Sequence, residues 1–282
     1  MIELSMHTDN WRCLSGSFEQ ACEAARRYGL EYIEFGVVDG QDFIQGLGYS
    51  PTVSLDSNPI KLRRYLDSMG LKVSQIDGAY PITGPLGSTF GVRYAQRAIQ
   101  FAAAIGCPRV DTTDGQFKPE GYTDDEVLAI TKENYRQIIE WAEDYEIIVN
   151  IETHGPYTND PEILDRMLNF FDTSRLQFNL DTGNTFIAGG NPVDFLKRFL
   201  PKLNYMHIKD VSQSLAAALR GEETGIAMSE SPIGQGVNAD NIDQCIQLLK
   251  DADWNGILSV ECLGTDENLD ASISWLRERL AS

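Results

Sequence analysis

An apolar run of the sequence ends in two residues that can carry out acid–base chemistry. Residues 147–151, Ile-Ile-Val-Asn-Ile, are typical of a buried β-strand, and Glu152 and His154 follow directly. Because the side chains of a strand alternate between its two faces, Glu152 and His154 are expected to point to the same side. The strand would then present a carboxylate and an imidazole together at its tip.

Three later β-rich runs end in the same way, at Asp181, His207 and Glu261. If these strand ends converge with Glu152, three carboxylates and one imidazole share one site and repel each other unless a cation lies among them. A divalent metal ion is therefore expected. Oxygen-rich ligation with one His favours Mn²⁺, with Mg²⁺, Co²⁺ or Fe²⁺ as weaker candidates, and argues against a structural zinc. Any one of these acids alone is more often a loop cap or a solvated edge.

Composition limits the classes of function. The chain has 282 residues, with 23 basic and 42 acidic side chains and a net charge of −19. Such a charge repels phosphate backbones and anionic membranes, so we expect neither a nucleic-acid nor a membrane partner. The sequence has no apolar run of bilayer length. Five cysteines without a C-x-x-C pair favour reduced thiols, and the expected location is cytoplasmic.

Strands and helices alternate along the whole chain. Capping boxes at Ser17–Gln20 and Thr123–Glu126, and Asn-Pro or Asp-Pro pairs, mark helix starts. The expected strands are residues 2–6, 31–35, 71–76, 109–113, 147–151, 176–180, 203–208 and 256–260. The expected helices begin at residues 17, 58, 92, 123, 160, 191, 241 and 269.

Eight such units with short connections predict an α/β fold, a single-domain (β/α)8 TIM barrel over residues 1–282, because parallel strands need crossover helices. A doubly wound open sheet is the rival, but no G-x-G-x-x-G follows the first strand. In a barrel the strand ends that carry the polar residues meet at the C-terminal face. Two long loops, 36–57 and 211–238, are expected to be lids or interface segments on that face. Phe43 and Tyr49 in the first loop would contact a sugar or, preferably, another subunit.

The combined motifs resemble those of a known family. E-x-H at Glu152, D-T-G-N at Asp181, H-I-K-D at His207 and V-E at Glu261 are similar to the sugar phosphate isomerase/epimerase family, the xylose-isomerase-like TIM barrels. The resemblance covers nearly the whole chain, and it implies that Glu152, Asp181, His207 and Glu261 are the metal ligands. The family includes ketose 3-epimerases, inosose isomerases and dehydratases, and catalytic subunits of C-glycoside deglycosidases.

The sequence departs from parts of this family. Endonuclease IV members use many histidines, whereas this chain has three. Many sugar isomerases have His after D-x-G, where this chain has Asn184. The E-T-H-G-P and I-G-Q-G-V-N-A segments are closer to the C-glycoside deglycosidase type. The family likeness also implies a homo-oligomer and, in the deglycosidase type, a small partner subunit.

The expected reaction is isomerisation or epimerisation of a keto sugar or cyclitol. Glu152 and Glu261 would exchange a proton with a carbon next to a carbonyl, and the metal would stabilise the enediolate. His154 would act on a hydroxyl, or would only hold a ligand by a hydrogen bond. The alternative is a metal-dependent lyase on a 3-keto sugar, of the inosose dehydratase or C-glycoside deglycosidase type. A non-catalytic sugar-binding barrel is the third reading.

Three further residues are expected to contact the substrate. Lys209 would neutralise an oxyanion, or pair with a neighbouring acid as scaffolding. His7, at the tip of the first strand, and Trp11 beyond it would contact the sugar. Asp77 and Asp111 are likewise candidates for contact with the sugar. Because the sequence has no basic cluster near the strand tips apart from Lys209, an unphosphorylated sugar is favoured.

Overall fold

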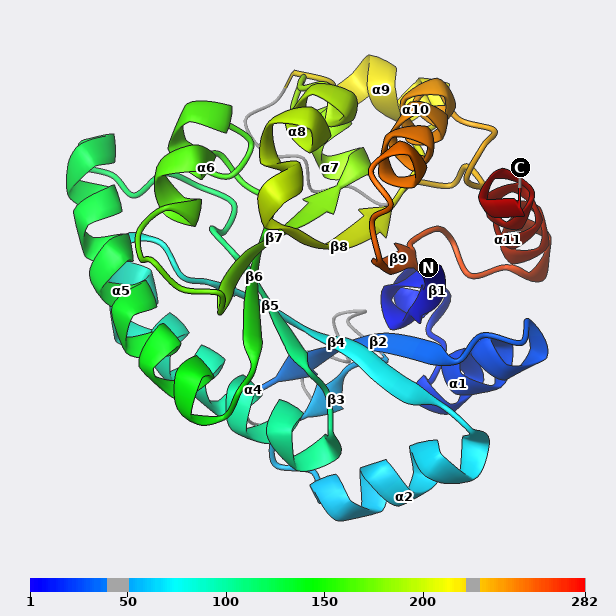
Figure 1. Cartoon of the computed structure of the whole chain (residues 1–282), viewed down its shortest axis with the longest axis horizontal. Helices are drawn as coiled ribbons and strands as arrows, with labels where there is room; N and C mark the ends of the chain where they lie inside the picture. The colour runs from blue at the N-terminus through cyan, green and yellow to red at the C-terminus, as the bar shows by residue number, and fades with distance from the viewer. Residues whose placement is uncertain (40–50, 222–228, 282) are drawn as a thin grey trace.

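Eight parallel strands close into a barrel with helices around it (Figure 1). The structure, a computed structural model, describes residues 1–39, 51–221 and 229–281. The strand order is β1-β9-β8-β7-β6-β5-β4-β2, and the pairing of β1 with β2 closes the ring. The strands are β1 (Ile2–His7), β2 (Tyr32–Val38), β4 (Lys72–Pro81), β5 (Arg109–Thr113), β6 (Ile148–Glu152), β7 (Leu176–Asp181), β8 (Leu203–Ile208) and β9 (Gly256–Val260). The predicted TIM barrel is confirmed.

The expected helices lie on the outside of the barrel. They are α1 (Phe18–Arg27), α2 (Pro59–Met69), α4 (Val92–Ile105), α5 (Asp124–Asp144), α6 (Pro161–Leu168), α8 (Pro192–Phe199), α10 (Ala239–Asp251) and α11 (Asp266–Ala281). Both capping boxes form: the side chains of Ser17 and Thr123 accept from the third helical N–H, and Gln20 and Glu126 bond back to the cap. The assignment of all of residues 1–282 to one domain stays a prediction.

Several short elements were not predicted, and most of them lie at the C-terminal ends of the strands. One of them follows β1 directly, where the His7 side chain accepts from the N–H of Asp9 and starts a 3₁₀ helix. A second, after β7, is started by Asp181. The additional elements are η1 (Thr8–Leu14), β3 (Val53–Ser54), α3 (Gly84–Leu86), the π-helix η3 (Gly87–Gly91), α7 (Thr182–Ile187), η4 (Leu200–Lys202) and α9 (Gln213–Leu219).

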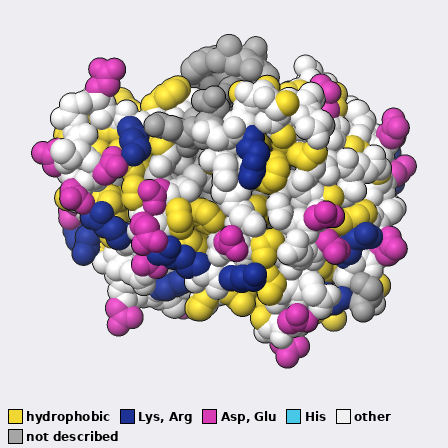
Figure 2. Space-filling model, turned by 90° about the horizontal axis from the view of Figure 1, so that it is seen from above, with side chains coloured by type: hydrophobic (Ala, Val, Ile, Leu, Met, Phe, Trp, Pro, Cys, Tyr) yellow, Lys and Arg dark blue, Asp and Glu magenta, His cyan; other side chains and the backbone are white. Residues whose placement is uncertain are grey.

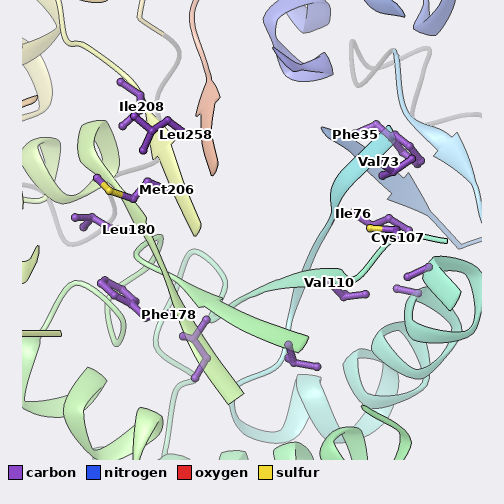
Figure 3. Packing of buried hydrophobic residues seen from close by; sticks show 14 of the residues in the cluster. Phe35, Val73, Ile76, Cys107, Val110, Phe178, Leu180, Met206, Ile208 and Leu258 are labelled. Carbon is purple, nitrogen blue, oxygen red and sulfur yellow. The ribbon is translucent and has the colours of Figure 1, made fainter. Parts of the chain in front are cut away.

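The hydrophobic core lies between the barrel and the helices. Leu180, Met206, Ile208 and Leu258 are fully buried and gather on one side of the barrel in Figure 3. Their strand neighbours point the other way, into the barrel. The barrel interior is polar: the Tyr205 hydroxyl lies 2.7 Å from that of Ser74. Polar residues inside the barrel therefore form the floor beneath the strand ends.

The two long loops are only partly described. Residues 36–57 contribute the end of β2 and the short β3, while Phe43 and Tyr49 lie outside the described residues. The 211–238 segment contains α9 and returns through Gly234 and Gly236, whose N–H groups donate to Asp210.

Surface charge, helix length and cysteine pairing bear on possible partners and location. On the face in Figure 2, basic side chains lie in separate small groups between acidic ones. Within the described ranges, the helices are all too short or too polar to cross a bilayer. All five cysteines are unpaired thiols, and of these only Cys13 is exposed.

Candidate active site

A polar cavity of about 260 Å³ lies at the C-terminal ends of the strands. Its wall combines residues from both halves of the chain, because parallel strands bring their ends to one face. The lining residues are His7, Asp9, Arg12, Asp77, Ala79, Glu152, His154, Asn184, His207, Lys209 and Glu261. We call this the inner cavity.

His207 lies between two of the predicted carboxylates. Its Nδ1 is 2.9 Å from Oε1 of Glu152 and 3.8 Å from Oε2 of Glu261. Met206 and Ile208 face the helices, so the alternation of β8 turns His207 inward. The ends of β6, β8 and β9 are therefore brought together, as the sequence predicted.

Asp181 joins this cluster through Lys209. One oxygen of Asp181 accepts from the N–H groups of Gly183 and Asn184 and so begins α7. The other oxygen of Asp181 lies 3.0 Å from Nζ of Lys209. The same Nζ lies 2.6 Å from Oε1 of Glu261. A Cβ at position 183 would lie 2.6 Å from Cγ of Lys209, which explains the glycine of the D-T-G-N motif. Lys209 is thus a buried cation between two buried carboxylates.

The residues of this cluster fit a divalent cation. Glu152, Asp181 and His207 each offer one ligand atom, and these atoms lie within 4.8 Å of one another. All three residues are buried, and Glu261 beside them is only 6% exposed. Several carboxylate oxygens and one imidazole nitrogen form a donor set that suits a divalent metal ion. The crowding of negative charge in a buried site also favours a bound cation.

Glu34 is a functional candidate that the sequence interpretation missed. It is fully buried on β2, and its Oε1 lies 2.9 Å from Nε2 of His207. Because Glu34 engages Nε2, the other ring nitrogen of His207 is left to face Glu152 and Glu261. Metal-binding histidines commonly donate their second N–H to a carboxylate in this way. The signal in the sequence was an acid between Ile33 and Phe35 in an otherwise apolar strand.

A chain of directed hydrogen bonds supports Glu34 from below. The side-chain amide of Asn150 donates to Gln75 at 2.6 Å, and the amide of Gln75 donates to Glu34 at 2.8 Å. Both residues are fully buried inside the barrel. The orientation of the His207 ring is thus fixed by residues from β2, β4 and β6.

The environment shifts the pKa values of the cluster in different directions. Burial opposes ionisation of Glu34, but the charges of His207 and His7 outweigh burial and lower the pKa of Glu34 to about 2. Burial disfavours the charged form of His207, yet Glu34 and Glu152 raise its pKa well above the usual value. Burial opposes the charge of Lys209 as well, and Asp181 and Glu261 nevertheless raise its pKa.

The two glutamates next to His207 differ. Burial raises the pKa of Glu152 to about 8, although its hydrogen bond with His207 acts in the opposite direction. Burial also disfavours ionisation of Glu261, but Lys209 and His207 lower its pKa below the usual range. Carboxyl groups whose environments separate their pKa values are suited to giving and taking protons.

His154 is neutral at physiological pH. Burial, together with the nearby charge of Lys209, lowers the pKa of His154 to about 3. Its Nδ1 is shielded from solvent and has no hydrogen-bond partner in the described parts of the chain. The backbone N–H of His154 donates to Thr158, whose own hydroxyl bonds to the buried Asp114. The imidazole is therefore held at the wall of the inner cavity.

The predicted substrate contacts divide into two groups. His7, Lys209 and Asp77 line the inner cavity, whereas Asp111 lies beneath it and accepts from Asn179 at 3.1 Å. Trp11 is not among the lining residues and is buried in the core, with its indole against Gly16 and Gly264.

The 3₁₀ helix η1 explains the position of Trp11. It turns Trp11 away from the cavity and presents Asp9 and Arg12, which form an ion pair at the cavity wall. The sequence interpretation did not predict these two residues.

Known proteins resemble this chain in sequence and in fold. Curated inosose dehydratases are similar over part of the chain: that of Geobacillus kaustophilus (strain HTA426) is 26% identical over 113 residues, 38% of this chain and 36% of that protein. The matched region thus covers about a third of the length of that relative. Several solved structures share the fold over nearly the whole chain.

The IOLI protein with a binding zinc atom has a TM-score of 0.76 at 15% identity, covering 99% of this chain and 98% of that chain. A D-tagatose 3-epimerase-like protein has a TM-score of 0.75 at 20% identity, covering 99% and 97%. The family described as Xylose isomerase-like TIM barrel matches residues 22–279. The chain belongs to the Xylose isomerase-like TIM barrel family.

Proposed function

We propose that this protein is a metal-dependent isomerase or epimerase of a keto sugar or cyclitol, acting by proton abstraction next to a carbonyl. The observation that carries the proposal is the position of Glu152 and Glu261, which approach the same nitrogen of His207 at 2.9 and 3.8 Å and both line the inner cavity. Two carboxyl groups at one site allow one to take a proton from carbon and the other to return it.

The four strand-end residues Glu152, Asp181, His207 and Glu261 would hold the cation, and Mn²⁺ suits this donor set best. A divalent cation at this position supplies charge stabilisation for the enediolate oxygens. The geometry supports Asp181 and His207 as ligands, because Asp181 is already fixed by two backbone N–H groups and His207 is fixed by Glu34. Such preorganised ligands require little rearrangement on binding.

Glu152 and Glu261 are proposed to act on the substrate carbon from β6 and β9. Neutral His154 has an unpartnered ring nitrogen and would exchange a hydrogen bond with a substrate hydroxyl. Lys209, 2.6 Å from Glu261, would keep that carboxylate ionised as a base and would contact a developing oxyanion. His7 would bind a further hydroxyl.

A lyase is the second candidate. The curated relatives are inosose dehydratases, and the inner cavity contains two groups, Lys209 and His154, that could hydrogen-bond to a departing oxygen. The same deprotonation would then be followed by loss of a β substituent. The non-catalytic reading has less support, because all four strand-end residues are present and converge.

The enzyme is proposed to work in the cytoplasm, in agreement with its unpaired thiols. Assembly as a homo-oligomer, or with a small partner subunit, remains a proposal from the family likeness. An unphosphorylated substrate remains proposed as well.

The test is deuterium exchange. The Mn²⁺-loaded protein is incubated in D₂O with keto sugars, inososes and 3-keto-glycosides, and products are followed by NMR. Deuterium at carbon with a rearranged sugar supports the isomerase or epimerase, whereas an unsaturated product with a released group supports the lyase. Glu152→Gln and Glu261→Gln should each lose at least about a hundredfold in exchange rate. Glu19→Gln, at an exposed position on α1, should keep the wild-type rate. No exchange with any substrate, together with no bound metal, rejects the proposal.

A further inference from the structure

The loop between β6 and α6 is fixed by one buried side chain from the neighbouring loop. Asp114 follows β5 directly and is 2% exposed. Its Oδ1 accepts from the N–H of Gly155 at 2.7 Å. Its Oδ2 accepts from the N–H groups of Tyr157 and Thr158 at 2.7 and 3.0 Å. Pro156 between them has no N–H. Asp114 therefore binds every main-chain N–H of this stretch.

His154 is tied to the same carboxylate through Thr158. The main-chain N–H of His154 donates to the Thr158 hydroxyl at 2.8 Å, and that hydroxyl donates to Oδ1 of Asp114 at 3.0 Å. Thr158 is fully buried, so both bonds are shielded from solvent. The main chain of His154, from which the imidazole reaches the inner cavity, is thus connected to Asp114 by one hydroxyl.

The two loops also meet backbone to backbone. A Cβ at position 155 would lie 1.9 Å from the carbonyl oxygen of Gly115 and 2.6 Å from Oδ1 of Asp114. This close approach explains the glycine of the E-T-H-G-P segment. The chain directly after His154 is therefore packed against the β5 loop as well as bonded to it.

A carboxylate can accept all of these bonds, whereas an amide cannot. Each oxygen of Asp114 faces at least one main-chain N–H. An asparagine would therefore turn its NH₂ group toward an N–H whichever way the amide is flipped. Because a buried donor without an acceptor is costly, the loop is expected to shift until that donor is released.

We propose that Asp114 is a positioning residue for His154: its carboxylate holds the loop so that the imidazole meets a hydroxyl of the substrate. The inference rests on the proposed function, in which His154 acts on such a hydroxyl. Asp114 is not among the residues that line the inner cavity, so it acts through the loop and not on the substrate.

The first test observes the imidazole directly. The chain has three histidines, so ¹⁵N-histidine labelling gives three rings, and the ring lost in His154→Gln is that of His154. Spectra are recorded without metal and with Mg²⁺, which is diamagnetic. Asp114→Asn should shift or broaden the ring signals of His154 and leave those of His7 and His207 in place. Unchanged His154 signals, or equal changes in all three rings, would overturn the proposal.

A second pair of variants removes a single link. Thr158→Val deletes the hydroxyl between His154 and Asp114 and should shift the His154 signals. Thr158→Ser keeps the hydroxyl and should leave them close to those of wild type. The same shift in both variants would show that the hydroxyl does not connect the two residues.

Asp210→Asn is the matched control for loss of stability. Asp210 is also buried and accepts from four main-chain N–H groups, but these belong to the 211–238 segment, which does not carry His154. This variant should lower the melting temperature about as much as Asp114→Asn, with a smaller effect on the His154 signals. A shift of His154 as large as that in Asp114→Asn would overturn the proposal.

In turnover the two residues should act as one. Asp114→Asn should lower the deuterium-exchange rate by about 10- to 100-fold in the wild-type background, and cause no further loss in His154→Gln. Equal losses in both backgrounds would overturn the positioning role. If wild type exchanges no deuterium with any substrate, the proposed reaction falls, and the imidazole signals still decide whether Asp114 positions His154. If wild type exchanges deuterium and Asp114→Asn changes neither the rate nor the signals, the reaction stands and the positioning role falls.

Discussion

Nε2 of His207 lies 2.9 Å from Oε1 of Glu34, a carboxylate on a strand three positions away around the barrel. The contact leaves Nδ1 of His207 facing Glu152 and Glu261. Glu34 therefore orients the proposed metal ligand without contacting the inner cavity itself.

Replacing Glu34 should weaken metal binding. Glu34→Gln keeps the size of the side chain but removes the charge that holds the His207 N–H, and a loss of about 10- to 100-fold in Mn²⁺ affinity is expected. Calorimetric titration of the metal-free protein measures it. Glu31→Gln is the control, because Glu31 is exposed on the same segment and pairs with Lys72. Unchanged affinity in Glu34→Gln would show that His207 needs no such support.

The same residue should make stability depend on pH. The folded-state pKa of Glu34 is about 2, below its usual 4.5, so ionised Glu34 stabilises the fold above pH 4.5 and this contribution is lost as the pH falls towards 2. In the metal-free protein, the unfolding free energy of wild type should exceed that of Glu34→Gln by up to about 3 kcal/mol near pH 6. The difference should shrink between pH 4.5 and 2.5, as measured by urea unfolding. A difference that grows on acidification would contradict the shift.

Lys209 should matter more without metal than with it. In Lys209→Met, Asp181 and Glu261 lose their shared cation, and the metal-free protein should lose about 3–5 kcal/mol of unfolding free energy. Mn²⁺ should restore more of the melting temperature in this variant than in wild type, because the metal ion supplies the missing charge.

Lys118→Met is the matched control for this experiment. Lys118 forms an exposed ion pair with Asp124, and such a change should cost less than about 1 kcal/mol. Equal destabilisation of Lys209→Met with and without Mn²⁺ would argue against a cation at the cluster.

The thiols should react in two classes. Burial raises the pKa of Cys22, Cys107, Cys245 and Cys262 to about 12, so these thiols stay protonated and shielded at pH 8. A colorimetric thiol reagent should therefore modify Cys13 quickly and the other four only on unfolding. Cys13→Ser should abolish the fast phase. A second fast thiol would indicate that one of the helices packs more loosely than described.

The strand ends could be predicted from sequence because each apolar run stops at a polar residue. Asp181 ends β7 and His207 is the last residue but one of β8, and the strand alternation turns both inward. Most helix starts could also be predicted, because a capping box, or a Pro after Asn or Asp, favours a helix start through contacts between neighbouring residues. These signals depend only on neighbouring residues.

The roles of Glu34 and Trp11 could not be predicted from neighbouring residues in the sequence. Glu34 lies within its strand, and its importance comes from a contact with a residue 173 positions away. Trp11 was expected at the substrate because it follows the first strand, but the His7 cap starts a 3₁₀ helix that turns the indole into the core. Both outcomes depend on tertiary neighbours that one sequence does not identify.

The buried series Asn150, Gln75, Glu34 and His207 has a direction, because each amide donates towards Glu34. Exchanging Gln75 for Glu would place two acceptors face to face, because the carboxylate at position 75 would replace the amide that donates to Glu34. The position of the proposed metal ligand consequently depends on amides that line no part of the inner cavity. Attempts to redesign this barrel for new sugars should leave its floor intact and vary only the upper walls.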